Sequence, residues 1–191
     1  MKNVDYYFCL NSPWSRYASI QLLKLKADLD LNLHLKPINI MRLFSEIGIL
    51  PVGQRTPAMQ QYRLDELARW SKRLALPINL KPAFFPCDES KADAIVLSAE
   101  QQKGLGLEVA AALSSALWAD EANLADPEFI DAQIAKYGLT EVMGADECRE
   151  IVEANTDELI ERNGIGVPTC YVGDQMFFGQ DRLDFVVDAL R

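Results

Sequence analysis

The apolar positions at the start of the chain change from a strand pattern to a helix pattern and back. Residues 4–10 (VDYYFCL) are rich in aromatic and branched side chains, which is typical of a buried strand. At 11–13 (NSP), an Asn or Ser side chain can cap a helix, and proline is tolerated in its first turn. Leucines continue that helix to about Lys26, and residues 31–38 alternate with period two. This order predicts a β-α-β unit with the helix as its crossover.

The end of the chain shows a different order. Asn163-Gly164 ends a helix, and residues 166–172 (GVPTCYV) predict a strand with proline near its start. Gly173-Asp174 predicts a two-residue turn, after which residues 175–179 return as the paired strand. Apolar residues from 183 to 190 then predict a closing helix, so this part of the chain is β-β-α.

The interval between these two units is predominantly helical. Helix patterns run through residues 62–74, 105–118 and 146–162. A capping box at residues 90–93 and the pair Asp126-Pro127 mark the starts of two more helices.

The whole order is that of a thioredoxin-like fold of the α/β class, interrupted by a large all-helical insertion. We expect residues 1–44 and 164–191 to form the thioredoxin-like domain and residues 45–163 to form the insertion. The chain contains no internal repeat and no linker composition that would divide it further.

Composition and charge limit the function. The 191 residues are 49% hydrophobic and 25% charged, which is ordinary for a folded domain. The formal net charge of -9 repels phosphate backbones, and the basic stretch at residues 63–73 also contains acids, so we expect no nucleic-acid partner. Asp5 interrupts what would be the apolar core of a signal peptide, and no apolar run approaches the roughly 20 residues of a membrane helix. We therefore expect a cytoplasmic protein with no membrane partner.

Four cysteines and one histidine offer little catalytic chemistry by themselves. The cysteines are far apart and form no C-x-x-C pair, so neither a zinc site nor a dithiol redox centre is predicted. His34 lies in an alternating strand pattern, where a solvent-facing or hydrogen-bonded histidine is more usual than a catalytic one, and no serine stands in a G-x-S-x-G motif. We expect no bound metal and four free thiols: Cys9, Cys87, Cys148 and Cys170.

Short motifs in one consistent order connect the chain to a known family. FCLNSPWS at 8–15 resembles the opening motif of the 2-hydroxychromene-2-carboxylate isomerases and kappa-class glutathione transferases, which are relatives of the DsbA oxidoreductases. YRLDELARW at 62–70 and PAFFP at 82–86 resemble a helix and a loop of the same family. GVPT at 166–169 and FGQDRL at 178–183 resemble its closing motifs. The resemblance implies a homodimeric, glutathione-dependent cis–trans isomerase that acts on an aromatic conjugated carboxylate.

Ser12 is the predicted catalytic residue. It lies where a strand passes into a helix, so backbone N–H groups and the positive end of the helix dipole favour an anion there. A dithiol relative would have a cysteine at this position, and because Ser12 replaces it, an external thiol must supply the sulfur. The resemblance implies that this thiol is glutathione and that Ser12 donates a hydrogen bond to its sulfur. The alternative is that Ser12 only caps the helix.

The resemblance also implies the other glutathione-binding residues. X-Pro bonds are the usual place for a cis peptide bond, and a cis Val167-Pro168 bond would leave the backbone of Val167 free to pair with the cysteinyl part of glutathione. Gln180 and Asp181 would bind the γ-glutamyl carboxylate and ammonium. An ordinary trans edge proline at Pro168, and a purely capping role for Asp181, are the alternatives.

The aromatic co-substrate is expected under the helical insertion. Its pocket would contain Trp14, Phe84 and Phe85, with Lys36 or Arg55 for its carboxylate. Trp118 is a further candidate, although aromatic residues at helical spacing more often belong to the core.

The chain departs from the family pattern at several of these positions. Phe84 replaces a frequent His or Asn, Gln54 replaces an Asn that commonly precedes Arg55, and Cys9 replaces an Asp. Cys9 is interpreted as a small buried hydrophobe, with a mixed disulfide to glutathione as the alternative. These departures leave two other functions open: a kappa-class-like glutathione transferase or peroxidase that consumes glutathione, and a non-catalytic thioredoxin-fold binding module.

Overall fold

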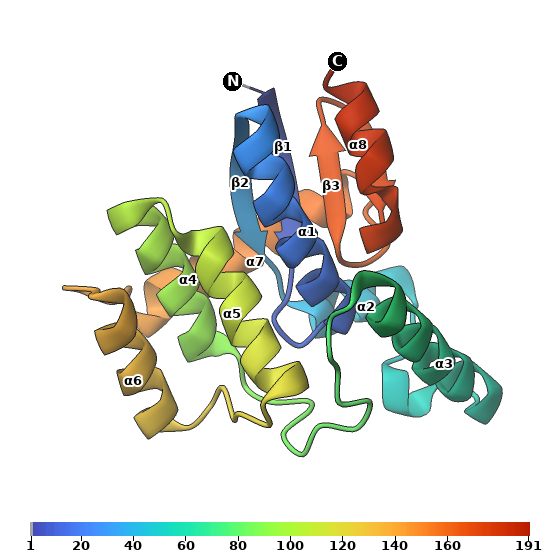
Figure 1. The fold of residues 1–191 in the computed structure, drawn as a ribbon, viewed down its shortest axis with the longest axis horizontal. Coiled ribbons are helices and arrows are strands. Elements are labelled where there is room, and N and C mark those ends of the chain that lie inside the picture. Colours follow the sequence, from blue (N-terminus) through green and yellow to red (C-terminus); the bar gives the residue numbers. More distant parts are fainter. Residues whose placement is uncertain (1) are drawn as a thin grey trace.

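A computed structural model describes residues 2–191 (Figure 1). Four strands form one mixed sheet in the order β2-β1-β3-β4. Strand β2 is parallel to β1, whereas β3 is antiparallel to both of its neighbours. The strand bounds are β1 (Lys2–Phe8), β2 (Leu31–Pro37), β3 (Thr169–Val172) and β4 (Gln175–Phe178). The predicted β-α-β and β-β-α units are confirmed, and together they form a thioredoxin-like fold.

Helices connect the strands and fill the long interval between β2 and β3. Their bounds are α1 (Pro13–Leu29), α2 (Ile40–Ile47), η1 (Val52–Gln54), α3 (Pro57–Leu74), α4 (Ser90–Lys103), α5 (Gly106–Ala119), α6 (Pro127–Tyr137), α7 (Ala145–Glu161), η2 (Gln180–Arg182) and α8 (Leu183–Ala189). α5 packs against α1, and α7 packs against β2 and α2. The inserted helices therefore lie directly on the sheet and on its crossover helix (Figure 1). Within residues 2–191, no helix has the length and apolarity needed to cross a membrane.

Each face of the sheet packs on its own set of helices. Tyr6 and Cys170 belong to the large buried cluster that also contains residues of α1, α4, α5 and α8. The next residues along the same strands, Tyr7 and Tyr171, belong to a second cluster with Leu159 of α7. Neighbouring strand residues point to opposite faces, as the period-two pattern requires.

α1 begins where the sequence predicts. Ser12 has an extended backbone, and its Oγ accepts a hydrogen bond of 3.1 Å from the Ser15 N–H, which caps the helix. Pro13 occupies the first turn, where a missing N–H leaves no hydrogen bond unmade. The buried hydroxyl of Tyr6 donates to the Ser15 carbonyl oxygen at 3.0 Å and lies 2.8 Å from the Ser19 hydroxyl oxygen. Tyr6 thereby joins β1 to the first turns of α1.

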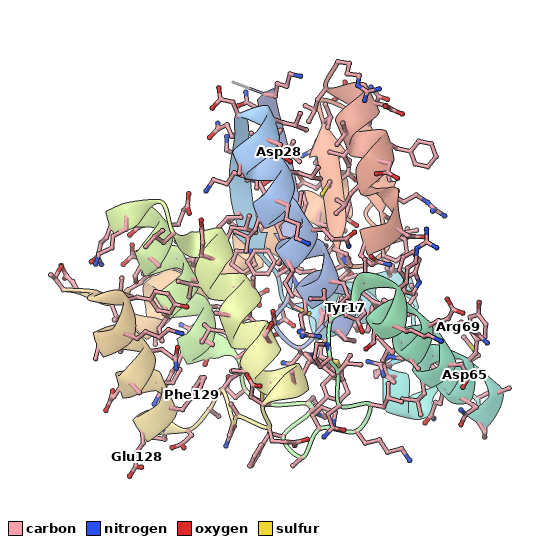
Figure 2. The ribbon with its side chains drawn as sticks, viewed as in Figure 1. Tyr17, Asp28, Asp65, Arg69, Glu128 and Phe129 are labelled. Carbon is pink, nitrogen blue, oxygen red and sulfur yellow. The ribbon has the colours of Figure 1, made fainter. Side chains whose placement is uncertain are left out.

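α3 is attached to the rest of the protein by few buried side chains. Of the 18 residues in this helix, all of which the structure describes, only Leu67 is fully buried. Tyr17 of α1 donates its hydroxyl to the Leu67 carbonyl oxygen at 3.2 Å. Figure 2 shows Tyr17 beside α3, with Asp65 and Arg69 on the outer side of that helix. α3 therefore lies beside α1 and contributes little to the core.

Arg162 directly follows α7 and connects this helix to β1 and β3 on the face of the sheet that packs against α7. Its guanidinium donates to the Asp5 carboxylate and to the Gly173 carbonyl oxygen, each at 2.7 Å. Its central carbon lies 3.7 Å from the centre of the Tyr171 ring, and the Tyr171 hydroxyl donates to the Arg162 carbonyl oxygen at 2.7 Å. His34 is exposed, and its Nδ1 lies 2.8 Å from the Asp5 carboxylate, so it belongs to the edge of this network, as a solvent-facing histidine.

We expect Arg162→Ala to lower the free energy of unfolding by about 2–3 kcal/mol, because the Asp5 carboxylate and the Gly173 carbonyl lose their donors together. Arg149→Ala is the matched control, since Arg149 makes only an exposed pair with Asp146 one turn away, and its loss should cost less than ~0.5 kcal/mol. Urea unfolding of the three proteins measures both values. Equal losses for the two variants would contradict this account of Arg162.

Candidate active site

A pocket of about 580 Å³ lies beside the first turn of α1, between α3 and the loops that flank β3 and β4. Its size is within the range of small-molecule binding sites. Six of the predicted site residues line it: Trp14, Arg55, Val167, Pro168, Gln180 and Asp181. The aromatic side chains of Tyr62, Trp70 and Phe178 line it as well. Segments that are far apart in the sequence therefore meet where the predicted site requires them to meet.

The loop before β3 presents an unpaired backbone to the pocket. The Val167-Pro168 peptide bond is cis, as expected. Val167 is buried, and across residues 2–191 its N–H and C=O pair with no other group. The carbonyl of Pro168, in contrast, accepts the Gly179 N–H at 2.9 Å. Val167 thus has the free donor and acceptor that an extended peptide ligand needs.

Gln180 and Asp181 also line the pocket, and they lie in η2, directly after β4. Gln180 is almost fully buried, and its side-chain oxygen accepts a hydrogen bond from Gln21 Nε2 at 2.8 Å, which fixes it to α1. Asp181 is paired with Arg182 at 2.8 Å and remains at the pocket edge. Gly179 has φ +110, and a Cβ there would meet the Asp181 carboxylate at 2.6 Å, so only glycine permits this placement of Asp181.

Ser12 is half-buried and lies two residues before Trp14, although it is not itself part of the pocket lining. Its Oγ caps α1 by accepting the Ser15 N–H. A hydroxyl has two acceptor lone pairs and one donor, so the cap leaves its proton available. Ser12 therefore caps α1, and this cap is compatible with a second hydrogen bond from Ser12 to a bound sulfur.

Lys36, Phe84 and Phe85, which the sequence analysis assigned to the co-substrate, do not line the pocket. Lys36 lies on the other face of the sheet, where its Nζ donates to Glu158 at 2.6 Å. Phe84 is 42% exposed and does not line the pocket. Phe85 packs on the fully buried Trp118, with ring centres 4.7 Å apart, so both belong to the core beneath α3.

Arg63 is a pocket residue that the sequence analysis did not single out. Its guanidinium carbon lies 5.6 Å from the centre of the Phe85 ring and 5.7 Å from that of Trp118. Burial, and then the nearby positive charge of Arg55, lower the pKa of Arg63 to about 10. The sequence does contain a feature that could have identified Arg63 as a pocket residue. It is seven residues before Trp70, and residues seven apart share one face of a helix.

All four cysteines are free, as expected, and none of them lines the pocket. Burial raises the pKa of Cys148 and of Cys170 to about 12 and that of Cys87 to about 11. Cys9 is buried against Tyr7 and its neighbours, and burial raises its pKa well above the ordinary value. Because thiolates are the reactive form, this placement favours the interpretation of Cys9 as a buried hydrophobe.

Two acids, the half-buried Glu89 and the buried Asp93, lie behind the loop that carries Ser12. The Asn11 N–H donates to Glu89 Oε2 at 2.6 Å, and the Asn11 amide also pairs with the backbone of Cys87. Burial raises the pKa of Glu89 to about 7. Asp93 follows one turn later in α4; burial and the Glu89 carboxylate raise its pKa, and its Oδ1 has no hydrogen-bond partner within residues 2–191.

This pair predicts how stability depends on pH. The pKa of Glu89 is higher in the folded state than its ordinary value of 4.5, so between about pH 4.5 and 7 the folded protein holds more protons than the unfolded chain. The free energy of unfolding should therefore fall as pH rises through that window. We expect Glu89→Gln to weaken this dependence and to be more stable than the wild type at pH 8 by about 1–3 kcal/mol.

Chemical denaturation from pH 4.5 to 8 measures the effect, with Glu150→Gln as control because Glu150 is an exposed carboxylate on α7. Parallel pH profiles for the wild type and Glu89→Gln would show that Glu89 is not the titrating group.

The fold, the serine at the start of α1 and the adjoining proline loop define a thioredoxin-fold protein that has no thiol of its own at that position. A family model described as the DSBA-like thioredoxin domain matches residues 3–191, and the chain therefore belongs to the DsbA-like thioredoxin family.

Comparison with individual proteins narrows this further. The 2-hydroxychromene-2-carboxylate isomerase of Pseudomonas putida is 27% identical over 98% of this chain and 93% of its own length. A solved 2-hydroxychromene-2-carboxylate isomerase superposes with a TM-score of 0.78 at 24% identity, covering 98% of this chain and 93% of that one. The cytosolic disulfide reductase DsbM from Pseudomonas aeruginosa, solved with GSH, superposes with a TM-score of 0.65 at 18% identity, covering 97% and 99%. The resemblance inferred from the motifs is confirmed, and the names of the sequence relatives support an isomerase.

Proposed function

We propose that the protein is a glutathione-dependent cis–trans isomerase of an aromatic conjugated carboxylate. One observation supports this most: the pocket joins the start of α1 to the unpaired backbone of Val167, yet no cysteine within residues 2–191 lines it. A thioredoxin-fold site without a thiol needs a thiol from a ligand. Glutathione is a thiol within a short peptide, and DsbM, which has the same fold, has been solved with GSH.

The residues on the sheet side of the pocket fit glutathione. In this proposal the free N–H and C=O of Val167 pair with the cysteinyl part, as a strand pairs with its neighbour. Asp181 accepts the γ-glutamyl ammonium, and Gln180, held by Gln21, binds the carboxylate beside it. The Ser12 hydroxyl then donates a hydrogen bond to the sulfur.

Bound glutathione supplies a thiolate that adds to a conjugated double bond, permits rotation about it, and leaves unchanged. The task of Ser12 is to favour the thiolate. A free thiol has a pKa of roughly 8.5, and lowering it by about two units requires ~2.7 kcal/mol of preferential stabilisation. A hydrogen bond from Ser12 to a charged sulfur contributes roughly 1.5–3 kcal/mol and the start of α1 adds ~0.3–1, so these two interactions are sufficient without a metal or a lysine.

The co-substrate occupies the remaining part of the pocket in this proposal. Trp14, Trp70 and Phe178 offer aromatic surface for its ring, and the arginines of the α3 side offer positive charge. The homodimer that the motif resemblance implies and the cytoplasmic location expected from the sequence are further parts of the same proposal.

Two measurements separate the proposed isomerase from the alternatives. A transferase or peroxidase would consume glutathione in proportion to product, whereas an isomerase returns it. A non-catalytic module that no longer binds glutathione would show no increase in melting temperature when glutathione is added.

We expect Ser12→Ala to fold and to bind glutathione, but to raise the pKa of the bound thiol. Its activity at pH 7 should fall about ten- to a hundredfold and recover partly as pH rises, because the lost hydrogen bond to a charged sulfur is worth roughly 1.5–3 kcal/mol. Thiolate absorbance near ~240 nm, titrated with glutathione bound, measures that pKa directly.

Two matched variants control this experiment. Ser12→Thr keeps the hydroxyl and should titrate like the wild type. Ser15→Ala removes a buried hydroxyl from the same helix turn, whose oxygen has no hydrogen-bond partner within residues 2–191, and should leave the titration unchanged. Identical curves for Ser12→Ala and the wild type would mean that Ser12 is only a helix cap.

A further inference from the structure

The α3 side of the pocket carries positive charge that no carboxylate balances. Two acids line the pocket, Glu66 and Asp181, and each is already paired with an arginine on its own segment. Arg63 and Arg55 also line it, and neither forms an ion pair with any residue from 2 to 191. Partial burial of a cation without a partner costs free energy, so an anion bound beside these two arginines would be stabilised.

Arg63 is better placed than Arg55 to hold an anion. The Nε of Arg55 donates to the Leu50 carbonyl oxygen at 2.9 Å, which turns part of its guanidinium toward the loop before α3. Arg63 instead packs against Phe85 and Trp118 and makes no hydrogen bond to the described residues. This packing uses the flat face of the guanidinium and leaves its N–H donors, which lie in the plane of the group, free.

We propose that Arg63 binds the carboxylate of the aromatic co-substrate and thereby selects anionic substrates. The inference rests on the proposed function, since it takes the aromatic carboxylate of that reaction as the ligand. A planar guanidinium can hold a carboxylate with two parallel hydrogen bonds, which fixes both distance and direction. With the carboxylate on Arg63, the ring of the ligand lies among Trp14, Trp70 and Phe178, which line the same pocket.

The division of the pocket supports this assignment. Of the residues that bind glutathione in our proposal, Val167 belongs to the loop before β3, and Gln180 and Asp181 belong to η2. Arg63 belongs to α3. Burial and the positive charge of Arg55 lower the pKa of Arg63. A bound carboxylate acts in the opposite direction, because it stabilises the charged guanidinium.

Calorimetric titration with two probes tests the proposal. Trans-cinnamate is an aromatic conjugated carboxylate, and cinnamamide has nearly the same shape without the charge. Both are titrated into the wild type, Arg63→Met, Arg63→Lys and Lys72→Met, first without and then with glutathione. Lys72→Met removes the same charge from an exposed position on α3 and is the control.

We expect Arg63→Met to weaken cinnamate binding about ten- to a hundredfold, the range of a charge-assisted hydrogen bond, and to change cinnamamide binding less than about threefold. Lys72→Met should change neither. Arg63→Lys keeps the charge but loses the planar donor pair, so cinnamate binding should fall by an intermediate factor. Should Arg63→Met fail to fold, the comparison of Arg63→Lys with the wild type carries the same test.

Several results would overturn the proposal: equal weakening of both probes, weakening of glutathione binding alone, or no cinnamate binding by the wild type. Absence of glutathione binding in the wild type would refute the proposed function instead, because the titrations without glutathione still report on Arg63.

Discussion

The hydrogen bonds of one buried hydroxyl hold the geometry on which the pocket depends. Tyr6 lies in the middle of the sheet, paired through its strand with β2 on one side and with β3 on the other. Its hydroxyl is bonded to the Ser15 carbonyl oxygen and to the Ser19 hydroxyl, and an unpaired phenol at this depth would cost roughly 1–3 kcal/mol. α1 can therefore neither slide nor rotate on the sheet without losing both bonds. That constraint fixes Ser12 and Trp14, which precede Ser15 by less than one turn.

The two sides of the sheet differ in how their charges are balanced. On the α7 side, Arg162 and Lys36 each have carboxylate partners, Asp5 and Glu158, within 2.7 Å. That network is complete, and its effect is to hold β1, the end of β3 and α7 together. At the pocket, in contrast, Arg63 and the backbone of Val167 have no partners among the described residues. Complete networks stabilise a fold, whereas incomplete ones are the places where a ligand gains most from binding.

The parts of this structure that could be predicted from the sequence are those encoded locally. Period-two and helical patterns give the order of elements, and the Asn-Ser-Pro sequence gives the capped start of α1. The placements that were missed depend on contacts between distant residues. Lys36 alternates like any strand residue, and only its partner Glu158, 122 positions later, shows that it faces away from the pocket. Phe85 could not be separated from pocket aromatics without its ring contact with Trp118, and Arg63 packs on the same two rings.

The shallow attachment of α3 affects how this family can diversify. Leu67 is the single residue of α3 that is fully buried, so apart from Arg63, which packs on Phe85 and Trp118, the pocket face of the helix has little contact with the core that determines folding stability. Substitutions on that face change which molecule is accommodated at little thermodynamic cost, whereas substitutions around Tyr6 disturb the whole sheet. In the function proposed above, the co-substrate contacts on α3 can therefore change while the residues proposed to bind glutathione, in the loop before β3 and in η2, stay fixed.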